Sequence, residues 1–184
     1  MARITTQAWS LVPLAVLAVP APAYAAQYMT VEQAMELAFP GADNFAAARV
    51  ALPAAEWSAI EREAPAPVAA REPRAWIASA AGETVGYLYV DEVLGKQLYI
   101  TYAAAVGPDG AVLRVEILEY RETHGYEVRN KRWLAQFAGK ESGSTLQLDR
   151  DIKNISGATL SCRHVTQGVR RLLAIHHARF QSRS

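Results

Sequence analysis

Residues 97–120, QLYITYAAAVGPDGAVLRVEILEY, decide the fold class of this chain. Both halves are rich in β-branched and aromatic residues, with apolar and polar positions in partial alternation, which is typical of strands. GPDGA, residues 107–111, separates them and is a tight-turn signal, so we predict an antiparallel hairpin. Polar Arg114, Glu116 and Glu119 interrupt the apolar residues of the second half, which predicts a sheet with one covered face.

The segment before this hairpin predicts two helices. The first begins at Thr30, whose spacing to Gln33 fits a capping box, and it ends before Pro40. Its apolar stripe comprises Val31, Ala34, Met35 and Leu37. A second, weaker helix is predicted over residues 54–63. The Ala- and Pro-rich residues 64–74 that follow predict a connector.

Two further strands and a short helix are predicted around the hairpin. AWIAS (75–79) and TVGYLYV (84–90) are rich in β-branched and aromatic residues, which favours strands. NKRWLAQFAGK (130–140) predicts a short helix that is ended by Gly139. Its apolar face consists of Trp133, Leu134 and Phe137.

The last helix is predicted to begin with Ser161 as its N-cap. Leu160 and Val165 then have the spacing of a hydrophobic staple. Its buried face is expected to comprise Val165, Val169, Leu172, Leu173 and Ile175, with Phe180 extending it. Together these elements predict one α+β domain, an antiparallel sheet packed against a few helices. We place the N-terminal helical segment and connector at residues 26–73 and the main domain at residues 74–180.

Residues 1–25 are typical of a secretory signal peptide and not of the folded domain. Arg3 carries the only charge, residues 11–19 form a short apolar run, and Ala23 and Ala25 fit a small-x-small cleavage site. The apolar run is too short to span a bilayer. We therefore expect cleavage after Ala25 and export of the mature chain to the periplasm.

Charge and cysteine content argue against several functions. The chain has 19 basic and 18 acidic residues, a balance that gives no support to nucleic-acid binding. No stretch after the leader approaches 18 uninterrupted apolar residues, so we expect no membrane insertion of the mature chain. The lone Cys162 excludes an internal disulfide and is interpreted as a small core residue and not a redox thiol. Adjacent His176 and His177 point in different directions on a helix, so no metal site is expected.

KNISGATLSCRHVTQGV, residues 153–169, joins a loop of small residues to the last helix. Gly157, flanked by Ser156 and Ala158, lets a bulky group approach the backbone. Thr159 supplies a hydroxyl close to the first turn of a helix, whose unpaired N–H groups and positive dipole end suit a phosphate. The residues alone leave two interpretations open, a phosphate-linked site and a simple turn with a helix cap, and the second is the more common.

ISGATLS (155–161) resembles the flavinylation motif of the FMN-binding domain family. That family includes the C subunit of the sodium-pumping NADH:quinone reductase and the G subunit of the Rnf electron-transport complex. In these proteins the threonine carries FMN through a phosphoester bond, made by a separate FAD:protein FMN transferase with magnesium. The resemblance implies that Thr159 is the FMN acceptor. The matching approach residues are Ser156, Gly157 and Ala158, and Leu160 is also expected to bind the cofactor.

YRETHGYEV (120–128) is similar to the Glu-Thr-x-Gly loop of the same family, which packs near the flavin ring. The resemblance implies ring-side roles for Glu122, Thr123, Gly125 and Tyr126. It covers roughly residues 75 to 175, which makes residues 74–180 the expected FMN-binding domain. Trp133 and Phe137 either lie over the ring or belong to the core, and both interpretations stay open.

The chain departs from the family pattern at three features. Lys153 stands where the family usually has an acidic residue, three positions before the motif serine. Asp151, two residues earlier, is the candidate to replace that acidic side chain. His124 occupies the loop position that is commonly proline. The membrane anchor of the two respiratory subunits is also missing, which indicates a free-standing exported relative.

The resemblance implies an electron carrier with covalent FMN and not an enzyme with its own small substrate. Its expected partners are the FAD:protein FMN transferase and membrane-bound or soluble redox proteins. Two alternatives remain. The first is a module that binds FMN noncovalently, and the second is a flavin-free interaction domain that has kept the fold.

Overall fold

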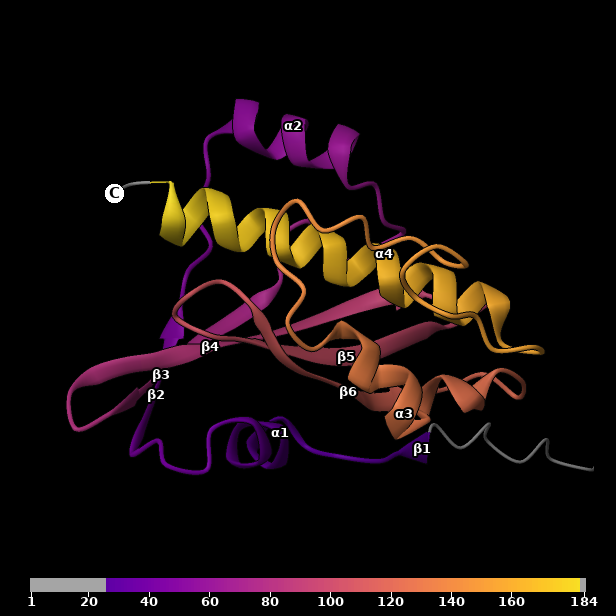
Figure 1. Cartoon of the computed structure of the whole chain (residues 1–184), viewed down its shortest axis with the longest axis horizontal. Helices are drawn as coiled ribbons and strands as arrows, with labels where there is room; N and C mark the ends of the chain where they lie inside the picture. The colour runs from indigo at the N-terminus through magenta and orange to yellow at the C-terminus, as the bar shows by residue number, and fades with distance from the viewer. Residues whose placement is uncertain (1–25, 183–184) are drawn as a thin grey trace, which may run out of the picture.

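The computed structural model describes residues 26–182, and the expected signal peptide lies outside them (Figure 1). The strands are β1 (Ala26–Gln27), β2 (Asn44–Ala48), β3 (Arg74–Ala80), β4 (Glu83–Leu94), β5 (Tyr99–Val106) and β6 (Val112–Tyr120). They form a six-stranded sheet in the order β1-β6-β5-β4-β3-β2, with every neighbouring pair antiparallel. The helices are α1 (Val31–Ala38), α2 (Ala54–Glu63), α3 (Lys131–Leu134) and α4 (Thr159–His176). A single α+β domain is therefore confirmed.

The predicted strands and hairpin are confirmed, and the structure adds two strands. The β5–β6 turn closes with a 2.8 Å hydrogen bond from the Gly107 N–H to the Ala111 carbonyl. β4 runs four residues beyond its predicted end at Val90. The extension was not predicted because the charged residues Asp91 and Glu92 interrupt the apolar pattern of the strand. β1 and β2 were not predicted, because neither shows alternation of apolar and polar residues. β1 has only two residues, and the sequence of β2, NFAAA, is nearly uniform.

Apolar side chains cover both faces of the sheet, so the prediction of one covered face is wrong. One cluster joins α4 to the β4–β6 side chains, and a second joins α1 to the opposite face. Figure 1 shows these helices on opposite sides of the sheet. In β6, Ile117 belongs to the first cluster and neighbouring Leu118 to the second, so consecutive apolar residues mark a doubly covered strand.

The N-terminal helices follow the sequence prediction closely. Thr30 and Gln33 form the predicted capping box, and α1 ends at Ala38. Leu37 is 43% exposed, so the predicted apolar stripe is wrong at that residue, and Phe39 is buried just beyond the helix instead. α2 spans the predicted residues and lies along α4, away from the sheet (Figure 1).

A buried ion pair joins β4 to α4. An Arg171 guanidinium nitrogen lies 2.9 Å from Asp91 Oδ2, and both side chains are 3% exposed. The guanidinium also donates to the Arg71 carbonyl of the connector and lies over the Trp57 ring of α2. Burial raises the pKa of Asp91, and the positive charge of Arg171 opposes that rise. The pair thus ties the sheet, the connector and two helices together.

His176, at the other end of α4 from Thr159, is buried among aromatic rings. Its Nδ1 lies 2.8 Å from the Tyr89 hydroxyl, and its Nε2 is buried without a hydrogen-bond partner in the described part of the chain. The rings of Tyr87 and Phe180 pack against it at centroid distances of 4.8 and 5.6 Å. Burial, with a smaller contribution from His177, lowers the pKa of His176 to about 4.

This lowered pKa predicts acid sensitivity. Because the unfolded chain protonates His176 near pH 6.5 and the folded chain only near pH 4, stability falls as the pH drops between these values. The expected loss is ~3 kcal/mol. Urea unfolding at pH 7, 5.5 and 4 should show this loss in the wild type but not in a Tyr89→Phe/His176→Phe variant. Equal losses in the two proteins would contradict the assignment.

Candidate cofactor site

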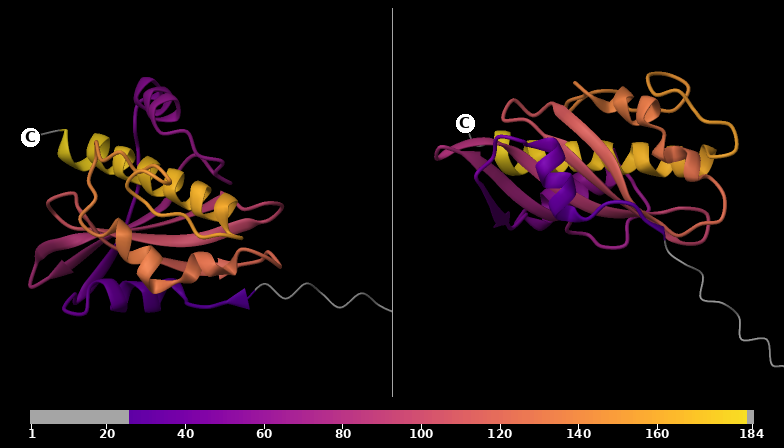
Figure 2. Two further views of the ribbon diagram at one scale, coloured as in Figure 1. Left: turned by 45° about the vertical axis from the view of Figure 1, so that its right-hand side comes forward. Right: turned by 90° about the horizontal axis from the view of Figure 1, so that it is seen from below.

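Three loops meet at the start of α4. They are the β4–β5 turn at residues 95–98, the loop at 121–126 after β6, and the loop at 153–158. Figure 1 places β1 and the start of α4 toward one end of the molecule, and the two turned views of Figure 2 agree. The structure therefore brings together the two loops that carry the predicted site residues.

The first turn of α4 has no side-chain cap. The helix begins at Thr159, with Ala158 in the N-cap position and no side-chain hydrogen bond there, so the predicted N-cap Ser161 is wrong. Ser161 is buried inside the first turn, and Leu160 is 37% exposed, so the predicted staple is also wrong. The sequence prediction favoured the side chain with the better capping chemistry, but Ser161 bonds to Tyr120 instead. The N-terminal N–H groups of an 18-residue helix thus have no side-chain acceptor.

Thr159 presents its hydroxyl at this uncapped end. The residue is exposed, and the Asn154 side-chain amide donates a 3.0 Å hydrogen bond to its Oγ1. That bond uses an oxygen lone pair and leaves the hydroxyl proton free. Exposed Gly157, with φ +88°, turns the chain just before the helix, and no atom lies within 4 Å of where its Cβ would be. A bulky group can therefore approach the hydroxyl.

The 121–126 loop is fixed against the first turn of α4. Tyr120 donates a 2.5 Å hydrogen bond to the His124 carbonyl, and its oxygen lies 3.0 Å from the Ser161 hydroxyl. Gly125 has φ +88°, and a Cβ there would lie 2.6 Å from the Tyr120 oxygen and 3.7 Å from the Ala158 Cα. The loop can pack this closely only with glycine at position 125.

Glu122 is a structural carboxylate. It accepts backbone hydrogen bonds of 2.5 and 2.9 Å from Gln97 and Leu98, and so holds the β4–β5 turn against the loop. Desolvation would raise the pKa of Glu122, but hydrogen bonds from Leu98, Gln97 and Lys96 outweigh it and lower the pKa. The side chain therefore stays ionised and positions the loops.

The aromatic candidates separate into core and surface. Trp133 and Phe137 are 4% and 0% exposed and pack edge to face at 5.2 Å, so they belong to the core. The Trp133 indole N–H also donates to the Lys153 carbonyl at 2.7 Å, which fixes the start of the 153–158 loop. Tyr126 is 55% exposed beside the site, and neighbouring Thr123 is also exposed. Tyr126 is therefore an exposed aromatic side chain that is placed to cover a ligand.

Asp151 does not replace the acidic residue that is missing at Lys153. Its carboxylate accepts hydrogen bonds from the Leu146 and Gln147 N–H groups at 3.0 and 2.7 Å, and it pairs with Lys140 at 3.2 Å. Desolvation would raise the pKa of Asp151, but these partners lower it. The Asp151 carboxylate is bonded within its own turn, so it does not supply the acidic side chain that is missing at Lys153.

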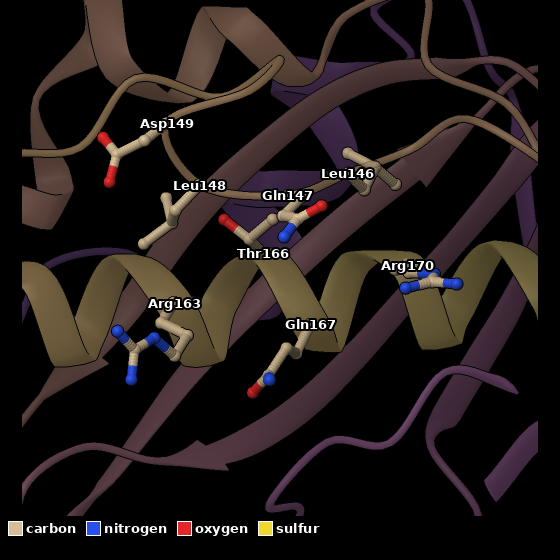
Figure 3. A pocket seen from close by; sticks show the side chains of 8 residues that line it. All are labelled: Leu146, Gln147, Leu148, Asp149, Arg163, Thr166, Gln167 and Arg170. Atoms are coloured by element: carbon tan, nitrogen blue, oxygen red, sulfur yellow. The ribbon is translucent and has the colours of Figure 1, made fainter. Parts of the chain in front are cut away.

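A groove of about 500 Å³ lies along α4, with Arg163 its lining residue nearest Thr159 in the helix (Figure 3). It lies between the helix and a loop, and its lining residues are Leu146, Gln147, Leu148, Asp149, Arg163, Thr166, Gln167 and Arg170. In Figure 3, Leu148 reaches toward α4, while Arg163 and Gln167 extend from the helix away from the loop. Arg163 lies one helical turn after Thr159 on the same side of α4. The sequence did not predict this groove, because residues 141–150 carry no periodic pattern.

Cys162, His176 and His177 do not form a site together in the part of the chain that the structure describes. Cys162 is fully buried, and burial raises the pKa of its thiol to about 11, so the thiol stays protonated at neutral pH. His176 is buried and His177 exposed, so they do not face one site. Within residues 26–182, no group of three or more His, Cys, Asp or Glu side chains could hold a metal ion.

Comparison with known proteins agrees with this geometry. Residues 95–174 match a family model described as the FMN-binding domain. The matched range contains all three loops and every predicted site residue. No curated protein gives a significant match. The resemblance to the FMN-binding domain family is thus confirmed over these residues, and it supports FMN as the ligand and a role in electron transfer.

Proposed function

Because residues 95–174 match the FMN-binding domain family, we propose that this protein is an electron carrier holding one FMN by a phosphoester bond to the Thr159 hydroxyl. The observation that carries the proposal is the uncapped start of α4 directly beside an exposed hydroxyl. The N–H groups of that turn and the positive end of the helix dipole suit phosphate oxygens. When bound, FMN supplies the electron-transfer chemistry, and the protein supplies attachment and orientation.

The residues around Thr159 suit the attachment reaction. The hydrogen bond from Asn154 orients the Thr159 oxygen and leaves its proton available to a base of the transferase. That oxygen forms a bond to the phosphorus on the FMN side of FAD, the bond to the bridging oxygen breaks, and AMP leaves. Arg163, one turn along the helix, adds positive charge near the attached phosphate.

The 121–126 loop is proposed to hold the ring end of the cofactor. Glu122 and Gly125 position the loop. Glu122 fixes the β4–β5 turn against it, and Gly125 permits close packing against Ala158. Exposed Tyr126 can stack on an aromatic ring. This division assigns the phosphate to α4 and the ring to the loop.

We further propose that the mature protein works in the periplasm with redox proteins as donor and acceptor. The signal-peptide pattern of residues 1–25 supports export. In the part of the chain that the structure describes, no helix is long and apolar enough to cross a membrane. Covalent attachment would keep the cofactor on a protein outside the cytoplasm, where dissociated FMN would be diluted. On this proposal the chain is a carrier without a small substrate of its own.

The test is the intact mass of the chain after co-expression with an FAD:protein FMN transferase and magnesium, followed by peptide mapping. The expected result is a mass increase of one FMN less one water, located on the peptide that contains Thr159. An unmodified chain beside an active transferase would contradict covalent attachment. Flavin that is released on denaturation would then favour the noncovalent alternative, and a colourless protein the flavin-free domain.

A further inference from the structure

Leu98, Tyr126 and Leu160 are exposed apolar side chains on the segments that meet near Thr159, and we call them the apolar rim. The large apolar side chains that remain exposed in residues 26–182 are Tyr28, Leu37, Leu98, Tyr99, Leu113, Tyr126 and Leu160. Leu98, Tyr126 and Leu160 are 42%, 55% and 37% exposed, and each comes from a different segment at the site. The Glu122 bond to Leu98 and the contact of Gly125 with Ala158 hold these segments together. Such clustering at a site indicates an interaction surface.

Exposed basic side chains lie on the segments that carry this rim and on the neighbouring α3. Lys96, Lys131, Arg132, Lys153 and Arg163 are all exposed, and within the described chain none of them forms an ion pair. We call these five residues the basic collar. Lys96 precedes Leu98 in the β4–β5 turn, and Lys153 is fixed through its backbone by Trp133 and Gln136. The collar therefore has charges on the 95–98 turn, the 153–158 loop, α3 and the first turns of α4, but none on the 121–126 loop.

Acidic residues are fewer than basic residues on the segments that carry the collar. Glu119 pairs with Arg121 at 2.6 Å, and the Glu122 carboxylate accepts backbone N–H groups. Residues 95–98, 119–132 and 153–163 together hold seven basic and three acidic residues, whereas the whole chain holds 19 and 18. The chain is nearly neutral overall but strongly polarised, with its positive charge concentrated at the cofactor end.

We propose that the apolar rim and basic collar form the docking face for an acidic patch on a redox protein. This inference rests on the proposed function, because electrons can pass only if a partner approaches the cofactor at Thr159. A charged collar steers such a partner and sets its orientation, while a small apolar contact suits a short-lived complex. An anionic bilayer would attract the same charges, but it offers no electron donor or acceptor.

The experiment measures electron transfer from the reduced, FMN-loaded protein by stopped flow. The acceptors are plastocyanin from plants, which is acidic, and mitochondrial cytochrome c, which is basic. We expect the rate with plastocyanin to fall at least about tenfold between 10 and 300 mM ionic strength, and the rate with cytochrome c not to fall. Lys96→Glu/Lys131→Glu should lower the plastocyanin rate about tenfold at low salt. Arg49→Glu/Arg62→Glu, with the same change in net charge on exposed residues away from the site, should leave it unchanged.

Three results would overturn this docking face. The first is a rate that does not depend on salt or acceptor charge, and the second is an equal loss in the control variant. The third combines two measurements on Lys96→Glu/Lys131→Glu: it no longer binds anionic lipid vesicles that the wild type binds, but its rate with plastocyanin is normal. That result would assign the face to a membrane. Intact mass reports cofactor loading separately. If the chain carried no FMN, plastocyanin binding by the wild type and both variants would still test the docking face.

Discussion

Thr159→Ala should abolish covalent flavin entirely. Co-expressed with the transferase and magnesium, the variant should keep its unmodified mass, and no yellow colour should remain with the denatured chain. The reason is that Thr159 provides the hydroxyl at the uncapped start of α4, where the phosphate is proposed to bind. Thr159 is exposed and has one side-chain hydrogen bond, so the free energy of unfolding should change by less than ~1 kcal/mol. Intact mass and urea unfolding measure the two quantities.

Two matched variants make this result specific. Thr159→Ser keeps a hydroxyl at the same backbone position and should retain attachment, at a rate equal to or below that of the wild type. Ser156→Ala removes the other exposed hydroxyl of the loop and should retain attachment fully. Flavin mapped to Ser156, or an unchanged yield in Thr159→Ala, would contradict the assignment.

Elements whose signals are local could be predicted from the sequence. The Thr30–Gln33 capping box, α2 and the β5–β6 hairpin depend on residues within a few positions of one another, and the structure has them where the sequence indicated. The SGAT motif and the Glu-Thr-x-Gly loop lie far apart in sequence. The family resemblance implied that both lie near one flavin, since no spacing rule would place them together, and the structure adds the close approach of Gly125 to Ala158.

Features that depend on tertiary partners were predicted wrongly or not at all. Ser161 has good N-cap chemistry, but its hydroxyl bonds to Tyr120, and the N-cap is Ala158, three residues earlier. The predicted strand ended before Asp91, because a charged residue is not expected inside a buried strand. Its partner, Arg171, lies 80 residues away in the sequence. In each case the sequence does not show whether the polar side chain bonds to a neighbouring residue or to one far away in the chain.

Removing one partner of the buried Asp91–Arg171 pair should strongly destabilise the fold. Asp91→Asn leaves the Arg171 guanidinium 3% exposed without its counter-charge, and we expect a loss of about 3–5 kcal/mol in the free energy of unfolding. Arg171→Met should cost a similar amount, because it leaves the carboxylate buried. Urea unfolding at pH 7 measures both losses.

A surface pair in the same protein provides the control. Arg71 and Glu61 lie 2.8 Å apart with side chains 51% and 50% exposed, so Glu61→Gln should cost less than about 1 kcal/mol. The double variant Asp91→Leu/Arg171→Met removes both buried charges and should be more stable than either single variant. Equal effects of Asp91→Asn and Glu61→Gln would contradict the burial of the pair.

The ion pair also connects stability to the cofactor site. Arg171 lies three turns along α4 from Thr159 and fixes the helix to β4, the strand that leads into the 95–98 turn. Because His164 bonds to the Leu94 carbonyl at the end of that strand, a shift of α4 would move the uncapped turn relative to all three loops. Asp91→Asn should therefore slow FMN attachment even at temperatures where the chain is folded, whereas Glu61→Gln should not. Normal attachment rates in a folded but destabilised Asp91→Asn protein would show that the site is held by its loops alone.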